Sequence, residues 1–246
     1  MICQYCENDR KLLKAHILPR SFHKHLNADG DNPILVPGDT GKHVTTSRIG
    51  EYDPSILCEE CEKKFGPYDD YGKKFFLDTN WDLLPRRSGW HDRIIEAPDA
   101  DYRLLKLFVL SVLLRAHWTN RPFYGVVNIG EKHAKALRDM IERGDAGDAQ
   151  RYGTTVFRFE PTGTDLDPKL GWRNPEVFRV EGIEIWRLWF HQFGALIKVD
   201  RRSLPHPLSH LVLDPAQKVR IVTRDFLSSR ELQSMLQTTM ARESVD

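Results

Sequence analysis

Four cysteines form the pattern in this sequence that is best suited to chemistry. Cys3 and Cys6 form one Cys-x-x-Cys pair, Cys58 and Cys61 form a second, and the sequence contains no other cysteine. This spacing lets the two sulfur atoms of one turn point to a common centre, and two such turns supply the four thiolates that zinc takes in structural sites. Because four protein ligands leave no position for water, we expect a zinc ion that stabilises structure and does not catalyse a reaction.

The same cysteines have two alternative interpretations, as disulfides or as a redox-active pair. The first residues lack a basic region followed by an apolar run, so we expect no secretory signal and a cytoplasmic location, where disulfides are disfavoured. A thioredoxin-like pair would need a strand before the motif and a helix after it, and that context is absent. Zinc is therefore the favoured interpretation, and it would supply folding energy to residues 1–75, which hold few large apolar side chains.

The elements between the two pairs are predicted to be short. Residues 11–18 alternate loosely and predict a strand with His16 at its end. Residues 27–52 are rich in turn-forming types and predict a long loop or an irregular hairpin. After the second pair, the sequence predicts a short helix that is interrupted or ended near Gly66 and Pro67.

The residues around the cysteines resemble those of a known family. The runs CQYC, KAHILPRSF and DPSILCEECEKK are similar to motifs of the HNH endonuclease superfamily, whose small ββα-metal module is often held by paired zinc knuckles. The resemblance implies a treble-clef-like ββα fold for the N-terminal part of the chain. It also implies a metal-dependent endonuclease that hydrolyses phosphodiester bonds in nucleic acid, with DNA as the expected partner, and many such relatives act in restriction or phage defence.

The resemblance assigns roles to three residues. His16 takes the place of the general base, and Glu62 takes the place of a ligand to a catalytic Mg²⁺ or Mn²⁺ ion. Asp53 stands where the family usually has an asparagine that fixes the loop, so it would orient the site, or bind the metal directly if the loop bends inward. Such a set suits phosphodiester hydrolysis, because an imidazole deprotonates water near pH 7 and a divalent cation neutralises charge on the phosphate.

One position departs from the family pattern. Ala15 stands directly before the base, where the family usually has Asp or another metal ligand. A site with Glu62 as its single expected carboxylate would hold a hard cation weakly. Nearby residues that could supply further ligands are His23, His25, Asp69 and Asp70. The departure leaves a second interpretation open, namely a catalytically inactive, zinc-stabilised module that binds nucleic acid or a protein partner.

Individual residues also have non-catalytic interpretations. His16 could be a polar residue that ends a strand beside a structural zinc. Glu62 could be a solvated helix residue, since acidic side chains are commonly exposed. The catalytic interpretation of both residues depends on their place between and beside the two cysteine pairs, because a motif is tested by its context.

Charge gives a local indication of the partner. The formal net charge of +1 creates no strong overall field. Basic residues nevertheless outnumber acidic ones near His16, and those expected to contact phosphates are Lys11, Lys14, Arg20 and Lys24. The alternative is that these side chains serve solubility alone.

The remainder of the chain predicts an α+β domain. Residues 101–118 predict a buried helix, and residues 131–143 predict an amphipathic one. The most apolar run, residues 104–118, contains Lys106 and Arg115 and is too short to cross a bilayer. Five β-rich runs between positions 154 and 222 predict a mostly antiparallel sheet. Ser228 and Glu231 have capping-box spacing, so a final helix is expected to begin there.

These observations predict an α+β protein in two parts. Residues 1–80 are expected to form a small zinc-bound ββα module, and residues 98–246 are expected to form an α+β domain with helices packed on a mostly antiparallel sheet. Residues 81–97 are expected to connect these two parts. The two helices of the second part are similar to the region behind the zinc motif in uncharacterised bacterial HNH-like proteins. We expect no membrane span, and the second part could carry a protein partner or a homo-oligomer interface.

Overall fold

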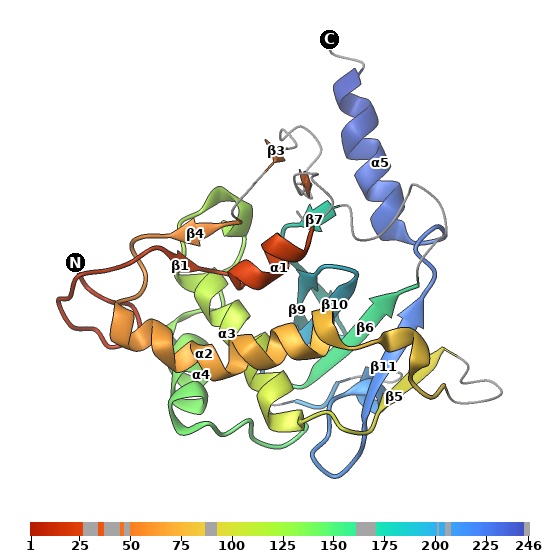
Figure 1. Cartoon of the computed structure of the whole chain (residues 1–246), viewed down its shortest axis with the longest axis horizontal. Coiled ribbons are helices and arrows are strands. Elements are labelled where there is room, and N and C mark those ends of the chain that lie inside the picture. Colours follow the sequence, from red (N-terminus) through yellow and green to blue (C-terminus); the bar gives the residue numbers. More distant parts are fainter. Residues whose placement is uncertain are drawn as a thin grey trace.

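The protein combines a large sheet with helices on its flank, as Figure 1 shows. The computed structural model describes residues 1–26, 34–36, 45–46, 50–86, 93–160, 171–200, 202–204 and 208–243. Its strands and helices confirm the predicted mixed α+β class with a mostly antiparallel sheet.

The main sheet has six strands in the order β5-β11-β6-β10-β9-β8. All neighbours are antiparallel except β11 and β6, which run parallel. The strands are β5 Ile94–Ala97, β6 Thr154–Phe159, β8 Glu176–Val180, β9 Ile183–Phe190, β10 Phe193–Lys198 and β11 Val219–Arg224. The β-branched and aromatic residues that predicted these strands are largely the ones that the sheet buries.

Five α-helices and several short elements complete the described structure. The helices are α1 Arg20–Leu26, α2 Glu59–Lys73, α3 Tyr102–Trp118, α4 Glu131–Arg143 and α5 Arg230–Glu243. Two smaller sheets join β1 Ala15–His16 to β4 Tyr52–Asp53, and β2 Ile34–Val36 to both β3 Thr45–Thr46 and β7 Gly171–Arg173. Single turns lie at η2 Trp81–Leu83, η4 Pro122–Tyr124 and η5 Leu208–Leu211. Strands β2 and β3 lie within residues 27–52, for which a long loop or an irregular hairpin was predicted, and most of that range is outside the described residues.

Helix α3 is the centre of the core. Asp101 caps its N-terminus by accepting a hydrogen bond from the Leu104 amide at 2.9 Å, and every residue from 105 to 116 is buried. Helices α2 and α4 pack against it. One continuous apolar cluster extends from Cys3 through α3 to Ile221 in the sheet, so the two predicted parts share a core; their boundaries at residues 80 and 97 stay predictions. None of the helices in the described ranges is long and apolar enough to cross a membrane.

Two predicted helix boundaries were wrong. Helix α2 continues through Gly66 and Pro67 and runs on as a π-helix, η1, at Lys74–Asp78. The proline removes one backbone donor, but Pro67 and Lys63 are both exposed, so water can bond the carbonyl that is left. Helix α5 begins one residue later than predicted, because Ser229 and not Ser228 accepts the capping bond from the Leu232 amide at 3.1 Å. Glu231 binds arginines instead of closing a capping box.

The predicted strand over residues 11–18 is much shorter in the structure. Leu12 makes an isolated bridge to Cys58, and the Leu13 amide donates to the Leu57 carbonyl at 3.0 Å. A ladder of two residue pairs forms between β1 and β4. The segment is therefore held by separate contacts to the chain around the second cysteine pair.

Two glycines of α2 provide a matched test of its packing. A Cβ atom at Gly72 would lie 2.5 Å from the ring of Phe108 in α3, whereas a Cβ at Gly66 would meet nothing within 4 Å. We expect Gly72→Ala to lower the free energy of unfolding by about 1–3 kcal/mol through overpacking. We expect Gly66→Ala to raise it by about 0.5–1 kcal/mol, because alanine favours the helix. Urea denaturation of both variants measures this, and equal effects would contradict the close approach of α2 to α3.

Candidate functional site

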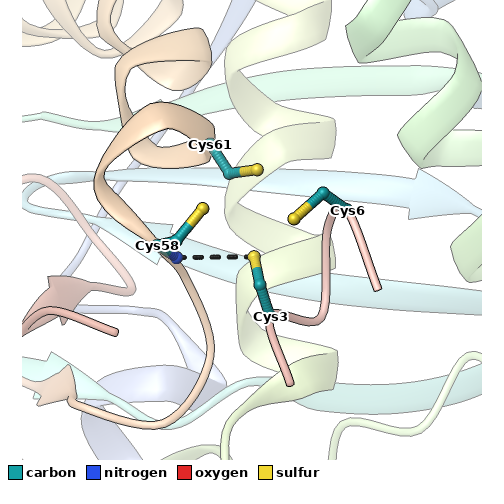
Figure 2. Close-up of side chains that lie close together, drawn as sticks. All are labelled: Cys3, Cys6, Cys58 and Cys61. Carbon is teal, nitrogen blue, oxygen red and sulfur yellow. Dashed lines mark hydrogen bonds between the residues drawn. The ribbon is translucent and has the colours of Figure 1, made fainter. Parts of the chain in front are cut away.

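The four cysteines lie together in the folded chain, as Figure 2 shows. Their sulfur atoms are all within 4.8 Å of one another, and Cys3, Cys58 and Cys61 are buried while Cys6 is half-buried. Four sulfur donors converging at such distances fit the tetrahedral thiolate set that zinc takes in closed structural sites. The structure thus bears out the cysteine cluster predicted from the sequence and is compatible with zinc binding.

Local backbone structure brings each pair to the centre. The Glu7 amide donates to the Cys3 carbonyl at 2.8 Å and closes the first turn, with Glu7 itself at a φ of 59°. Cys58 is the N-cap of α2, and its amide donates to Cys3 Sγ at 3.4 Å. Cys61 lies in the first turn of α2, where the helix dipole favours a negatively charged sulfur.

Burial raises the pKa of the Cys61 thiol, and hydrogen bonds with Cys58 and Cys6 raise it further. Four negatively charged sulfur atoms at such separations would also repel one another. A divalent ion at their centre reverses this preference, because it stabilises the thiolate form. The donor set thus fits a metal ion and gives a physical reason for one.

Helix α4 fastens the first cysteine turn to the rest of the protein. Tyr5, between the first two cysteines, donates its hydroxyl hydrogen to Glu142 at 2.6 Å, and Lys64 of α2 makes an ion pair with the same carboxylate at 2.6 Å. Arg138 donates to the Tyr5 carbonyl at 3.1 Å. The cysteine cluster is therefore held between α2 and α4.

Strand pairing decides which side chains flank His16. Ala15 pairs with Asp53, and His16 pairs with Tyr52. Because side chains alternate along a strand, Ala15 and Asp53 share the buried face, and His16 and Tyr52 share the outer, half-buried face with ring centroids 6.0 Å apart. His16 thus lies at the outer side of this small sheet, and the methyl group of Ala15 is enclosed.

Asp53 fixes the loop that follows β4. Its carboxylate accepts hydrogen bonds from the Ser55 amide at 2.8 Å, the Thr119 hydroxyl at 2.6 Å and the Asn120 amide at 3.3 Å. Burial alone would raise the pKa of Asp53, but these hydrogen bonds outweigh burial and lower it. Asp53 therefore stays ionised near neutral pH, and its oxygens are engaged by the loop.

Arg115 joins His16 to α2, a role that no local sequence pattern predicts. Its guanidinium is 2% exposed, pairs with both carboxylate oxygens of Asp69 at 2.9 and 2.6 Å, and donates to the His16 carbonyl at 3.1 Å. The one sequence signal was a charged residue in an otherwise apolar helix, which requires a partner when buried. Asp69, considered above as a further metal ligand, is engaged by this arginine.

Glu62 is half-buried in the first turn of α2. Burial raises the pKa of its carboxyl group, and the charge of Arg115 opposes the rise. Among the described residues, the four cysteines are the one group of three or more His, Cys, Asp or Glu side chains close enough to hold a metal ion. His16 and Glu62 are thus not part of such a group in that portion of the chain. Asp70 is exposed on α2, and the side chain of His25 lies outside the described residues.

His23 lies behind His16 and is predicted to make stability depend on pH. Burial, and then the charge of His16, lower the pKa of His23 from 6.5 to about 4. Between these two values the unfolded chain takes up a proton that the folded chain does not. Stability is therefore complete above about pH 6.5 and is lost as the pH falls toward 4, by ~3 kcal/mol.

The comparison of the parent with His23→Phe measures this effect. Zinc ligands also lose affinity in acid, so unfolding free energies of both proteins are needed at each pH, and their difference isolates His23. We expect that difference to change by ~3 kcal/mol across the window. A difference that stays constant from pH 6.5 to pH 4 would contradict the prediction.

All four basic residues proposed for phosphate contact are exposed, namely Lys11, Lys14, Arg20 and Lys24. Two cations lie against Tyr52, the neighbour of His16 on the small sheet: the Lys14 ammonium and the Arg121 guanidinium are each 5.3 Å from the centre of the Tyr52 ring. Arg121 also donates to the Tyr52 carbonyl at 2.7 Å. The sequence analysis did not single out Arg121, because it lies 69 residues from Tyr52 in the chain.

Comparisons with protein-family models, curated proteins and solved structures found no match for this chain. The class of the protein is therefore defined by its fold and its cysteine cluster. It is an α+β protein with a six-stranded, mostly antiparallel sheet and a cluster of four cysteines compatible with a structural zinc ion.

Proposed function

We propose that the protein is a metal-dependent endonuclease of the HNH type that hydrolyses phosphodiester bonds in nucleic acid, with DNA as the substrate. In this proposal β1, β4 and α2 form the ββα module, and the four cysteines hold a structural zinc beside it. The observation that carries the proposal is the arrangement around the β1–β4 pair. Asp53 uses its carboxylate to fix the loop after β4, which is the role that the family resemblance gives to this position.

His16 is the general base of the proposed reaction. Its ring lies on the outer, half-buried face of the small sheet, where a water molecule and a phosphate can approach. Its backbone is held by the hydrogen bond from Arg115 to its carbonyl, which limits the directions that the imidazole can take. The low pKa of His23 keeps that neighbouring ring neutral near pH 7, so it adds no positive charge against protonation of His16.

Glu62 is the proposed ligand of the divalent ion, Mg²⁺ or Mn²⁺. Such an ion would supply charge neutralisation at the phosphate. One carboxylate with substrate oxygens completing the shell is a known arrangement for these hard cations. Phosphates would be attracted by the cations on this side of the chain, which include the exposed Lys14 and the half-buried Arg121 beside Tyr52.

Nicking of supercoiled plasmid DNA by the zinc-loaded protein, in Mg²⁺ or Mn²⁺, tests the proposal. We expect His16→Ala to lower the cleavage rate about 100-fold or more, because general base catalysis contributes about that much. His210→Ala, at an exposed position in η5, is the matched control and should cleave at the parental rate. Cleavage by His16→Ala as fast as by the parent would refute the proposal.

A second function is favoured by one observation. Ala15, where a metal ligand is expected, is fully enclosed and faces Asp53, and Asp53 is engaged by the loop. A catalytically inactive module that binds nucleic acid would accommodate this arrangement. It predicts salt-dependent retention of DNA with no cleavage in any divalent metal, and His16-dependent nicking would exclude it.

A further inference from the structure

A cavity of about 290 Å³ opens at the far end of α2, where this helix changes into the π-helix η1. Its walls come from Lys74 and Phe75 of η1, Trp81 of η2 and the turn after β5. Tyr71 lies nine residues after Glu62, about two and a half helical turns, so it faces the opposite side of α2. The cavity is therefore distinct from the proposed catalytic site.

Aromatic rings form much of the wall of this cavity and are held in place from behind. Tyr71 stacks on Phe75 with ring centroids 6.1 Å apart, and Phe75 meets Trp81 edge to face at 4.9 Å. Trp81 in turn contacts Phe193 of the sheet at 5.1 Å. The Tyr71 hydroxyl accepts a hydrogen bond from the Asp101 amide at 2.5 Å. The walls are thus preorganised, which reduces the entropy lost when a ring binds.

The polar groups of the cavity have mixed character. Lys74 supplies an ammonium group, Asp99 supplies a carboxylate, and Thr79 supplies a hydroxyl. A ligand that satisfies both charges must carry hydrogen-bond donors as well as acceptors or negative charge. Its ring system must also be small, since ligand pockets span roughly 300 to 1,000 Å³ and the volume of this cavity is just below that range.

The π-helix is an independent observation at the same place. Such segments are rare and occur frequently at functional sites. Here the π-helical residues include Lys74 and Phe75, one polar and one aromatic part of the cavity wall. The rare π-helical segment thus coincides with the cavity.

We infer that this cavity binds a nucleobase, as part of a nucleoside or nucleotide. The planar base packs against the aromatic wall, since base–aromatic stacking tolerates every base. Asp99 accepts hydrogen bonds from an amino group or from the sugar hydroxyls, and Lys74 attracts the phosphate or a base carbonyl. The inference does not depend on nuclease activity, because it uses no residue of the proposed catalytic site.

Titration calorimetry with the full chain tests the inference, with the four nucleoside 5′-monophosphates, the matching nucleosides and benzoate as probes. We expect at least one nucleoside or nucleotide to bind with a Kd below about 1 mM, and benzoate to bind at least about tenfold more weakly. Ala100→Leu, which places a larger side chain in the wall, should weaken binding about tenfold or more. Leu83→Ala, 79% exposed in η2 and outside the wall, should leave binding unchanged.

A second pair of variants keeps the test decisive if Ala100→Leu fails to fold. Lys74→Ala should weaken the monophosphates at least about threefold more than the nucleosides, whereas Lys73→Ala should change neither. Lys73 pairs with Asp78 and is outside the cavity wall, so it is a matched control. The inference is overturned if no probe binds, if benzoate binds as well as the nucleosides, or if Lys74→Ala affects all probes as Lys73→Ala does.

Discussion

Removal of the metal ligands is expected to cause the largest loss of stability in this protein. In Cys61→Ser, or after strong chelation of the parent, we expect the segment around the four cysteines to unfold and the melting temperature to fall by about 10 °C or more. Structural zinc contributes roughly 10–16 kcal/mol of apparent binding free energy in small zinc peptides, which is comparable with the whole stability of a domain. Loss of ~4 kcal/mol alone would produce this shift in a chain of this size.

The reason for so large an effect lies in what the cysteines connect. The residues before β1 contain one isolated bridge between Ile2 and Asp9 and another between Leu12 and Cys58. Backbone hydrogen bonds close this segment on itself, and one from the Gln4 amide to the Ile56 carbonyl joins it to the chain before Cys58. The metal and the contact of Tyr5 with Glu142 of α4 provide its further links to the rest of the protein. Cys3, Cys58 and Cys61 belong to the apolar core around α3, so we expect the metal to stabilise this core as well as the cysteine turns.

Differential scanning calorimetry with metal analysis measures the effect. Zinc added back to the chelated parent should restore the melting temperature, and zinc added to Cys61→Ser should not. Ser111→Ala, a buried change that removes a hydroxyl and leaves the four cysteines intact, controls for the general cost of a core substitution. A metal-free parent that melts within about 2 °C of the zinc-loaded protein would contradict a structural role for zinc.

The buried ion pair of Arg115 and Asp69 is expected to give the second largest effect. Arg115→Met should lower the free energy of unfolding by about 3–5 kcal/mol, because it leaves the carboxylate of Asp69 without its partner in a poorly solvated place. Methionine keeps most of the length of the side chain, which packs with its guanidinium 5.0 Å from the centre of the Phe65 ring. The expected loss of unfolding free energy in Arg115→Met is therefore due to the unpaired charge of Asp69 and not to a cavity.

A double-mutant cycle separates pairing from packing. The double variant Arg115→Met with Asp69→Leu removes both charges and should recover about 2 kcal/mol or more of the loss. The exposed pair of Arg10 and Glu60, 3.8 Å apart, is the matched control, and Arg10→Met should cost less than about 1 kcal/mol. Urea denaturation of all variants measures these values. Equal costs for Arg115→Met and Arg10→Met would contradict the importance of the buried pair.

The same variant has a consequence for the proposed function. Arg115 holds the carbonyl of His16, so its loss should reduce nicking of DNA even under conditions where Arg115→Met is folded. An unchanged nicking rate in the folded variant would show that the carbonyl contact does not position His16. Loss of folding and loss of positioning are distinguished by circular dichroism on the same sample.

Periodicity made most of the α+β part of the fold predictable. Helix α4 lies over Glu131–Arg143, the predicted range, and Gly144 ends it in the left-handed conformation at a φ of 61°. Strand β6 occupies Thr154–Phe159, also the predicted range. These features depend on the secondary-structure propensity of each residue and on the spacing of apolar residues along the chain. Both can be recognised from residues that are close together in the sequence.

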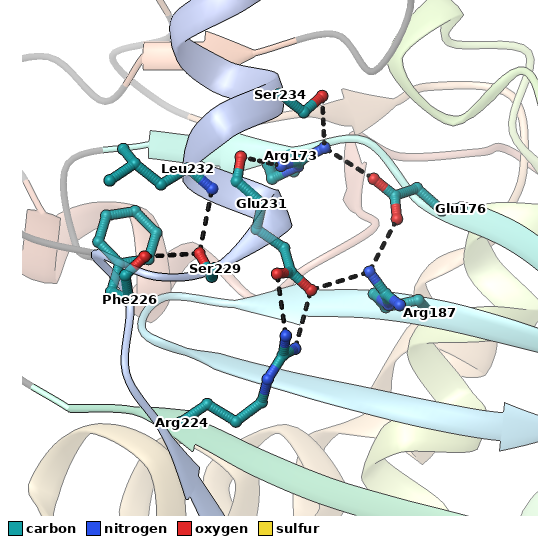
Figure 3. Close-up of polar contacts among 9 residues, drawn as sticks. All are labelled: Arg173, Glu176, Arg187, Arg224, Phe226, Ser229, Glu231, Leu232 and Ser234. Atoms are coloured by element: carbon teal, nitrogen blue, oxygen red, sulfur yellow. Dashed lines mark hydrogen bonds and ion pairs between the residues drawn. The ribbon is translucent and has the colours of Figure 1, made fainter.

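Other elements could not be predicted, because their partners are distant in the chain. Strand β2 pairs in parallel with β7, and no local pattern specifies such a match. Helix α2 passes Pro67 because this residue faces solvent and the opposite side packs on α3. Ser229, and not the predicted Ser228, caps α5. The carboxylate of Glu231 accepts hydrogen bonds from Arg187 and Arg224 of the sheet, as Figure 3 shows, and so does not complete a capping box.

The sequence alone determined the cysteine cluster. Each Cys-x-x-Cys turn places two sulfur atoms close together within four residues, and a four-sulfur site needs both pairs because the sequence has no other cysteine. The tertiary structure decided what surrounds His16. In the folded chain Ala15 lies on the buried face of the small sheet and Asp53 accepts hydrogen bonds from its loop. Arg115, 99 residues from His16 in the chain, donates to the His16 carbonyl. Burial makes such charges and hydrogen bonds strong, and burial is a property of the packed chain rather than of any local run of residues.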